Sequence, residues 1–432
     1  MTSGINMDEK KILILGAGFA GLKTLKILSA HRHKYNLQIT LVNQHRWSLF
    51  SPLMPDLISG RISPDHMAYE LEPFCRNHNI RFEHALVKSI DIDNKSIETT
   101  NGTLSADFIV LALGCETNYH GNGEFKQKIP GLKSLHEGIL IRNLIKQVID
   151  ESKNTAGKKA NIVIVGAGYT GFEVASHTAL YASQYCRHPL SELSEIVNIH
   201  MLEYGDRVLG NTTESVQEWA KKLIRHYDVR IQTGVTVKQL QDNRKAMLTD
   251  GTVYEDAALI WTAGVTPGSV CRELDVSKQK TGRLNVDTYL RIPGHPEIFA
   301  IGDVAAPVPK NHDQPLRMSV QFSLAGAHLA AKNILNTITN KPLMEFDPFD
   351  PGYVIPMGPG HAMSRIMGHE MHGRAPFFLH YLMSVYRSWG WKNKFSVMKD
   401  LFSELLPWPG IEERHRRTDD IHTDYQKRNP PQ

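Results

Sequence analysis

The sequence contains the same glycine-rich pattern twice, each time directly after a short apolar run. The first copy, KILILGAGFAG, covers residues 11–21, and the second, NIVIVGAGYTG, covers residues 161–171. An apolar run that stops at a glycine and leads into a helical stretch is typical of a strand–turn–helix unit that binds a dinucleotide. The repeat therefore predicts an α/β fold with two Rossmann-type domains.

The apolar runs support this fold because they fall at similar places in two consecutive units. Helices are expected at residues 20–31, after the second glycine pattern, and at 320–335. Strands are expected at residues 11–16, 37–44, 106–114, 160–166, 197–205, 257–264 and 296–305.

The order of these segments predicts a first domain that is interrupted by an inserted second one. We expect residues 1–155 and 270–345 to form the first domain and residues 156–269 the second. Residues 346–412, rich in Met, Gly and aromatic side chains, are expected to form a small C-terminal domain. The polar residues 413–432 are expected to be a flexible tail.

Each glycine of the repeated pattern has its own physical reason. The first allows a tight turn, the second lets the backbone approach a pyrophosphate, and the third lets helix and strand pack closely. The helix N-terminus then faces the negative charge. These positions are Gly16, Gly18 and Gly21 in the first copy and Gly166, Gly168 and Gly171 in the second. The alternative is a pair of tight strand–helix turns without a ligand.

The residue that ends the second strand of each unit distinguishes the two copies. In the second unit it is Glu203, whose carboxylate accepts hydrogen bonds from a ribose diol and repels a 2′-phosphate, so this site should prefer NADH to NADPH. In the first unit it is Asn43, which bonds a ribose hydroxyl without adding charge. Asp303 can bond the polyol chain of a flavin, or it can be the N-cap of a helix.

Composition excludes several other classes of protein. The 432 residues include 49 Lys and Arg against 45 Asp and Glu, and this balance argues against a nucleic-acid partner. The 21 His are scattered without metal-ligand spacing, so no metal is expected. No apolar run of about 18 residues and no signal peptide are found, so we expect no spanning helix. Four dispersed cysteines fit a reducing compartment, and we expect a cytoplasmic protein.

Five short motifs occur in a characteristic order: GAGFAG, LALG (111–114), VGAGYTGFE, WTAG (261–264) and FAIGDVA (299–305). This order resembles that of the two-dinucleotide flavoproteins in the FAD/NAD(P)-dependent pyridine nucleotide-disulfide oxidoreductase superfamily. Longer stretches, such as LALGCETNY, MLEYGDRVLG and RIPGHPEIFAIGDVA, are most similar to the type II NADH:quinone oxidoreductases, the single-subunit, non-pumping NADH dehydrogenases. This family resemblance implies a C-terminal part that docks on a membrane.

The resemblance also implies two nucleotide sites. NADH would be bound in the second domain by Gly166, Gly168, Gly171, Glu203 and Gly264. FAD would be bound in the first domain by Gly16, Ala17, Gly18, Phe19, Ala20, Gly21, Asn43, Gln44, Val87, Gly114, Gly302, Asp303 and Val320.

Two residues are implied as catalytic in the transfer of a hydride from NADH to FAD and of two electrons to a quinone. Glu173 matches a family glutamate beside the nicotinamide and the flavin, where the first copy has Lys23. Gln321 matches the first glutamine of a quinone-site helix, but Ala325 replaces the second. The acceptor therefore stays open between a quinone and a soluble electron carrier or small oxidant. A third alternative is an NADH-responsive flavoprotein without steady turnover.

The cysteines argue against two related activities. Residues 20–35 lack the CxxxxC pattern of a disulfide reductase. Cys115 has no evident partner of the kind that a sulfide:quinone reductase needs at its flavin, so we expect a small buried residue there. The remaining cysteines, Cys75, Cys186 and Cys271, are expected to be structural or surface thiols.

Residues 376–408 are predicted to form two amphipathic helices. Their apolar stripes comprise Phe378, Leu382, Val385 and Trp389, and Phe395, Met398, Phe402 and Leu405. Tryptophans alternate here with basic residues, which suits a peripheral contact with anionic lipid on the inner face of the plasma membrane. The alternatives are that the helices cover the domain core or contact a second copy of the chain in a homodimer.

Overall fold

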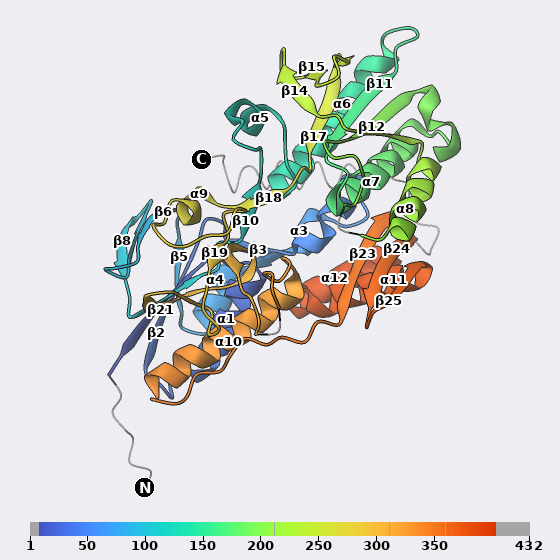
Figure 1. Ribbon diagram of the computed structural model, residues 1–432. Coiled ribbons are helices and arrows are strands. Elements are labelled where there is room, and N and C mark those ends of the chain that lie inside the picture. Colours follow the sequence, from blue (N-terminus) through green and yellow to red (C-terminus); the bar gives the residue numbers. More distant parts are fainter. Residues whose placement is uncertain (1–7, 211, 311, 359, 403–432) are drawn as a thin grey trace. The chain divides into compact units, whose positions relative to one another are not determined.

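The computed structural model describes residues 8–402, except residues 211, 311 and 359, and divides into two compact units (Figure 1). The first unit comprises the described residues up to Ser48, together with Tyr69–Glu116 and Val265–Asp350. The second comprises Leu49–Ala68, Thr117–Gly264 and the described residues from Pro351 onward. The predicted tail at 413–432 lies outside the described residues.

The first unit is built on a six-stranded sheet of order β20-β21-β9-β1-β2-β5. All neighbouring strands are parallel except β20 and β21. The strands are β1 (Lys10–Leu15), β2 (Leu37–Asn43), β5 (Arg81–His84), β9 (Phe108–Leu111), β20 (Arg291–Ile292) and β21 (His295–Ala300). The strands expected at 11–16, 37–44, 106–114 and 296–305 are confirmed, although the last two end several residues earlier than predicted.

The sequence of β1 explains its central place in this sheet. Its last four residues, Ile12 to Leu15, are all buried, because both faces of a parallel sheet are covered. Helix α1 (Phe19–His31) follows the strand and packs against α10 (Val320–Ile338). Small buried residues of α10, among them Ala327 and Ala331, let the two helices approach closely. Both predicted helices are confirmed.

The second unit repeats the arrangement with a four-stranded parallel sheet of order β13-β12-β11-β17. The strands are β11 (Ala160–Val165), β12 (Val197–Glu203), β13 (Val229–Thr233) and β17 (Ala257–Trp261), and the helices are α6 (Leu135–Lys153), α7 (Tyr169–Cys186) and α8 (Glu214–His226). The strands predicted at 160–166, 197–205 and 257–264 are confirmed. Two Rossmann-type sheets thus occur in one chain, as the repeated pattern predicts.

The C-terminal part of the second unit begins with a sheet that the sequence patterns did not indicate. Strands β23 (Gly352–Gly358), β24 (His361–Ile366) and β25 (His369–Gly373) form an antiparallel sheet, drawn in orange and red in Figure 1. The predicted helices follow as α11 (Arg374–Arg387) and α12 (Trp391–Phe402). Helix α11 packs on β23 and β24, and β23 packs on α7. The C-terminal part is therefore packed against the Rossmann-type part of the second unit.

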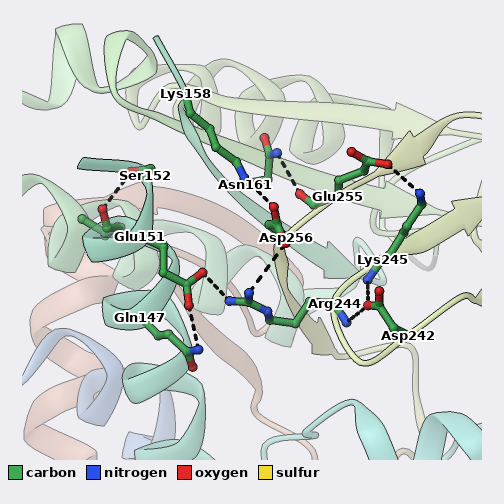
Figure 2. Close-up of polar contacts among 11 residues, drawn as sticks. Gln147, Glu151, Ser152, Lys158, Asn161, Asp242, Arg244, Lys245, Glu255 and Asp256 are labelled. Atoms are coloured by element: carbon green, nitrogen blue, oxygen red, sulfur yellow. Dashed lines mark hydrogen bonds and ion pairs between the residues drawn. The ribbon is translucent and has the colours of Figure 1, made fainter. Parts of the chain in front are cut away.

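An ion-pair network on the second unit links segments that are far apart in the sequence (Figure 2). The Arg244 guanidinium lies 2.6 Å from the Glu151 carboxylate at the end of α6 and 3.6 Å from the Asp256 carboxylate. Asp256 also pairs with Lys158, and this contact lowers the pKa of the Asp256 carboxyl. Because the groups are exposed, each pair contributes about 1 kcal/mol at most, and the contribution is lost as acid protonates the carboxylates.

Candidate dinucleotide-binding sites

Four parallel strands of the first unit end at the same edge of its sheet, where ligands of such sheets bind. Gly16 follows β1, Asn43 ends β2, Gly114 lies beyond β9, and Gly302 lies beyond β21. Because these strands are neighbours in the order β21-β9-β1-β2, the fold brings this part of the predicted FAD set together.

The first glycine loop combines two crowded positions with one open position. Gly16 has a φ of +96°, and a Cβ there would lie 2.5 Å from the Ala112 carbonyl oxygen. A Cβ on Gly21 would lie 1.8 Å from the Gly16 carbonyl oxygen. At Gly18, by contrast, no atom lies within 4 Å of an added Cβ. Packing therefore requires glycine at the first and third positions, while the space beside the middle glycine is free for a ligand.

This open position lies at the N-terminus of α1. Gly18 is the N-cap, no side chain caps the helix, and the first turn contains no acidic residue. The partial positive charge of the helix end is therefore not compensated by a protein carboxylate, which favours a bound anion. The loop fits the pyrophosphate of a dinucleotide, as predicted for Gly16, Ala17, Gly18, Phe19, Ala20 and Gly21.

Asn43 holds the loop in this shape. Its Oδ1 accepts a hydrogen bond of 2.9 Å from the Ala17 amide, and its Nδ2 donates one of 2.7 Å to the His45 carbonyl. Gln44 is exposed and lies 3.2 Å from the His45 ring. The sequence predicted a ribose contact for Asn43, and the structure adds a backbone contact that positions the loop.

Asp303 lies within a short 3₁₀ helix, η3 (Gly302–Val304), whose N-cap is Ile301. The N-cap interpretation of Asp303 is therefore wrong, and the flavin interpretation remains. The Cys115 thiol donates to the Asp303 carboxylate at 3.5 Å. Cys115 is half-buried, so the expectation of a small buried residue is also wrong.

The remaining first-unit residues are more dispersed. Val87 opens β6 (Val87–Asp91), and its side chain is buried in the apolar core cluster. Val320 and Gln321 begin α10, and the Gln321 amide donates to the Phe349 carbonyl at 3.3 Å and to Asp350 at 3.4 Å. Sequence reasoning missed Arg283, which is buried and donates to the Ala305 carbonyl at 2.9 Å, because no local pattern marks it.

The second glycine loop has the same geometry as the first. Gly166 has a φ of +107°, and a Cβ there would lie 2.8 Å from the Ala263 backbone. A Cβ on Gly171 would lie 2.0 Å from the Gly166 carbonyl oxygen, whereas nothing lies within 4 Å at Gly168. Gly168 is the N-cap of α7, again without a side-chain cap or an acidic first turn. This loop also fits a pyrophosphate.

Glu203 occupies the place that Asn43 has in the first unit. Its Oε2 accepts from the Ala167 amide at 2.9 Å, and its Oε1 accepts from the Gly205 amide at 2.9 Å. A carboxylate has about four acceptor positions, so two backbone contacts leave capacity for a ribose diol. Gly264, which lies beyond β17, is at the same sheet edge and has a φ of +103°.

Glu173 lies in the first turns of α7, beyond the open glycine. Burial raises the pKa of its carboxyl well above the usual value, and the neighbouring Asp56 carboxyl raises this pKa further. Sequence reasoning did not identify Asp56, because Asp56 lies in a short segment far from Glu173 along the chain. Only the packing of helices α2 (Met54–Ser59) and α7 brings the two carboxyls into one environment.

A protein-family model described as "Pyridine nucleotide-disulphide oxidoreductase" matches residues 10–327. The chain belongs to the pyridine nucleotide-disulphide oxidoreductase family. The matched range contains both glycine loops, which agrees with the superfamily resemblance inferred from the motifs.

Individual curated proteins and solved structures are similar to this chain over most of its length. A curated protein of Staphylococcus saprophyticus named "Type II NADH:quinone oxidoreductase" is 26% identical over 386 residues, which cover 86% of this chain and 93% of the relative. A Staphylococcus aureus protein of the same name is also 26% identical, over 384 residues. Among solved structures, NDH2 from Plasmodium falciparum in complex with NADH has a TM-score of 0.80 at 17% identity, covering 92% of this chain and 98% of that one.

The open glycines allow a test of both sites without damage to the fold. Gly18→Ala should weaken FAD binding about tenfold, because the new methyl group occupies the space left for a pyrophosphate, while Gly168→Ala should weaken only NADH binding. Both glycines have negative φ values that alanine adopts. Flavin content and NADH titration of the purified variants measure the two effects. Equal flavin loss in both variants would contradict the assignment of the loops. Gly21→Ala is the control for general loss of structure, because its Cβ would clash with the Gly16 carbonyl oxygen.

Glu203 should set the preference between the two nicotinamide nucleotides. Glu203→Ala removes the charge that repels a 2′-phosphate and the acceptors for the ribose diol, so the NADPH-to-NADH ratio of kcat/KM should rise about tenfold or more. Steady-state kinetics with both nucleotides measure this ratio, and flavin content checks that the first site is intact. An unchanged ratio would show that Glu203 does not contact the ribose.

Proposed function

We propose that the protein is an FAD-dependent NADH dehydrogenase that passes two electrons from NADH to a quinone. The observation that carries this proposal is the pair of open glycine loops with matched geometry, one held by neutral Asn43 and the other by the acidic Glu203. A bound FAD would supply the redox chemistry, namely acceptance of a hydride from NADH and reduction of the quinone by two electrons. The names of the staphylococcal relatives support a quinone as that acceptor.

The chain's own residues bind and orient the two nucleotides. We assign the first-unit set around Gly18, Asn43 and Asp303 to FAD, and the second-unit set around Gly168 and Glu203 to NADH. Glu173 is assigned to the nicotinamide side because it follows the second glycine loop within the same helix. The sequence-based ranges for the FAD domain (1–155 and 270–345) and for the NADH domain (156–269) stay predictions.

Gln321 is the residue that we assign to the acceptor side. Its side-chain nitrogen is directed toward Asp350, whose carboxylate also forms a bidentate pair with Arg317 at 2.5 and 2.7 Å. These contacts hold the amide in one orientation. Ala325, one helical turn later, has no polar side chain, and this observation favours the second candidate function, reduction of a soluble electron carrier or small oxidant.

An anaerobic titration followed by turnover assays tests the proposal. NADH should bleach the visible flavin absorption, and a soluble quinone should restore it and raise the rate of NADH oxidation above the rates with oxygen or a ferredoxin-like carrier. Gln321→Ala should lower kcat/KM for the quinone about tenfold without slowing flavin reduction by NADH. Asn336→Ala, at the other end of α10, is the matched control. A colourless protein that does not take up FAD, or no acceleration by any quinone, would refute the function.

We also propose that the outer face of α11 and α12 contacts a membrane surface. Phe378, Leu382 and Tyr386 of α11 and Trp391 and Phe395 of α12 are all exposed, with Trp391 at 77%. Large apolar side chains in such a group are seldom left in water, so this face does not simply cover the domain core. Lys394 lies 5.2 Å above the Tyr386 ring, which combines positive charge with apolar surface. The predicted stripe residues Phe402 and Leu405 are not used in this proposal, because no side chain is described from Phe402 onward.

Because this face combines exposed apolar side chains with positive charge, we propose that it contacts anionic lipid. The alternative is contact with a second copy of the chain. Among the helices that the structure describes, none is long and apolar enough to cross a bilayer. A peripheral contact needs only an amphipathic face, as α11 provides.

The double variant Leu382→Asp and Trp391→Asp should weaken binding to anionic vesicles at least tenfold, because two exposed apolar side chains would no longer enter the lipid interface. Co-sedimentation with vesicles measures the binding, and Val253→Asp, an exposed apolar site in β16 (Val253–Tyr254), is the control. Unchanged sedimentation would contradict lipid contact. A shift from dimer to monomer on gel filtration would favour the homodimer instead.

A further inference from the structure

Within the second unit, four buried polar side chains form a cluster that the nucleotide-binding residues do not explain. Asp56 comes from α2, Arg61 from the segment after it, His177 from α7 and Tyr381 from α11. All four side chains are buried, at 6% exposure or less. Burying charged groups is unfavourable unless they are well paired, so their arrangement indicates a specific role.

The contacts within this Asp56 cluster form a directed chain. Arg61 donates to the Tyr381 hydroxyl at 3.0 Å, and that hydroxyl donates to the Asp56 carboxylate at 2.7 Å. The Arg61 guanidinium also lies 3.5 Å from the same carboxylate and 5.1 Å from the Tyr381 ring centre. The two contacts with the carboxylate favour the ionised form of Asp56, and the contacts of the guanidinium favour the cationic form of Arg61.

His177 connects the cluster to the helix that carries Glu173. Its Nδ1 lies 2.7 Å from the Ser59 hydroxyl, and its Nε2 lies 3.9 Å from the Asp56 carboxylate. Glu173 and His177 are four residues apart on α7, so they share one face of the helix. Asp56 therefore lies near the part of α7 that carries Glu173, and its carboxyl adds to the rise that burial causes in the pKa of Glu173.

The two carboxyls differ in their partners. Asp56 has a guanidinium and a hydroxyl donor within the distances given above. Among residues 8–402 that the structure describes, no donor contacts the Glu173 side chain, and only its backbone carbonyl accepts a bond, from Ser176. When two neighbouring carboxyls compete for one proton, the one with fewer donors keeps the proton.

We propose that Asp56 is a positioning residue that keeps the Glu173 carboxyl in its neutral, proton-bearing form. The proposal rests on the proposed function only in taking Glu173 as the residue on the nicotinamide side. A neutral carboxyl can donate a hydrogen bond, which an ionised one cannot, and it adds no negative charge where a hydride is transferred.

The other titratable groups around the cluster agree with this assignment. Burial lowers the pKa of His380 on α11 to about 4, so this ring is uncharged at neutral pH. The Arg61 guanidinium and the His177 ring are the basic groups that face Asp56. Burial raises the pKa of Tyr227, after α8, to about 12, so this hydroxyl stays protonated. Burial raises the pKa of Asp56 as well, but Arg61 and Tyr381 oppose that rise, whereas Asp56 adds to the rise at Glu173.

An infrared pH titration of the full-length flavoprotein tests the proposal without NADH or quinone. The wild type should show a protonated-carboxyl band that persists above the ordinary pH range of glutamate and is absent in Glu173→Gln. In Asp56→Asn the negative neighbour is gone and Arg61 remains, so the pKa of Glu173 should fall by about one pH unit or more. Tyr381→Phe should shift it in the same direction by less, because Asp56 then competes better for the proton.

Two controls keep the test decisive. Tyr181→Phe changes a buried tyrosine elsewhere on α7 and should leave the Glu173 titration unchanged. If Asp56→Asn does not fold, Tyr381→Phe still decides, since it removes only a hydroxyl. A Glu173 titration that is identical in wild type, Asp56→Asn and Tyr381→Phe would overturn the proposal, as would a wild type without a band that Glu173→Gln removes. Failure of quinone-dependent turnover would refute the proposed function and leave this result standing.

Discussion

Both nucleotide sites depend on one close contact, the approach of the third glycine of each loop to the carbonyl oxygen of the first. A Cβ would lie 1.8 Å from that oxygen at Gly21 and 2.0 Å at Gly171, closer than any side chain can come. The contact presses the start of each helix against the end of its strand. It thereby places the helix N-terminus and the open middle glycine where a pyrophosphate can meet them.

The two loops share their geometry and differ in charge. Asn43 and Glu203 make the same bond to the loop backbone, to the amides of Ala17 and Ala167. The Nδ2 of Asn43 donates to the His45 carbonyl, while the second carboxylate oxygen of Glu203 accepts from the Gly205 amide. The shared bond shapes the loop, and the difference in charge is the basis on which we assign FAD to the first loop and NADH to the second.

The Asp56 cluster shows how the C-terminal part is joined to the nucleotide-binding part of the second unit. Helix α11 turns Phe377 and Tyr381 inward and Phe378 and Leu382 outward, so one helix has a buried face and an exposed apolar face. The inward Tyr381 hydroxyl bridges Arg61 and Asp56, which offsets part of the cost of burying their charges. A helix fixed in this way can present an apolar surface to a partner without losing its own position.

The sequence by itself determined the two Rossmann-type sheets, the glycine positions and the contrast between Asn43 and Glu203, because strand endings, turn requirements and charge are local properties. The helices at 376–402 followed from their amphipathic spacing, but the strands before them did not, since β23 to β25 lack a distinct alternation. The N-cap alternative for Asp303 and the expectation of a buried Cys115 were wrong, because the exact start of a short helix and the exposure of a single side chain are set by the folded surroundings. Only the tertiary structure decided which groups surround Asp56 and that Asp56 lies near Glu173. Asp56 and Arg61, His177, and Tyr381 come from three separate segments, and no local pattern encodes the packing of α2, α7 and α11 that buries them together.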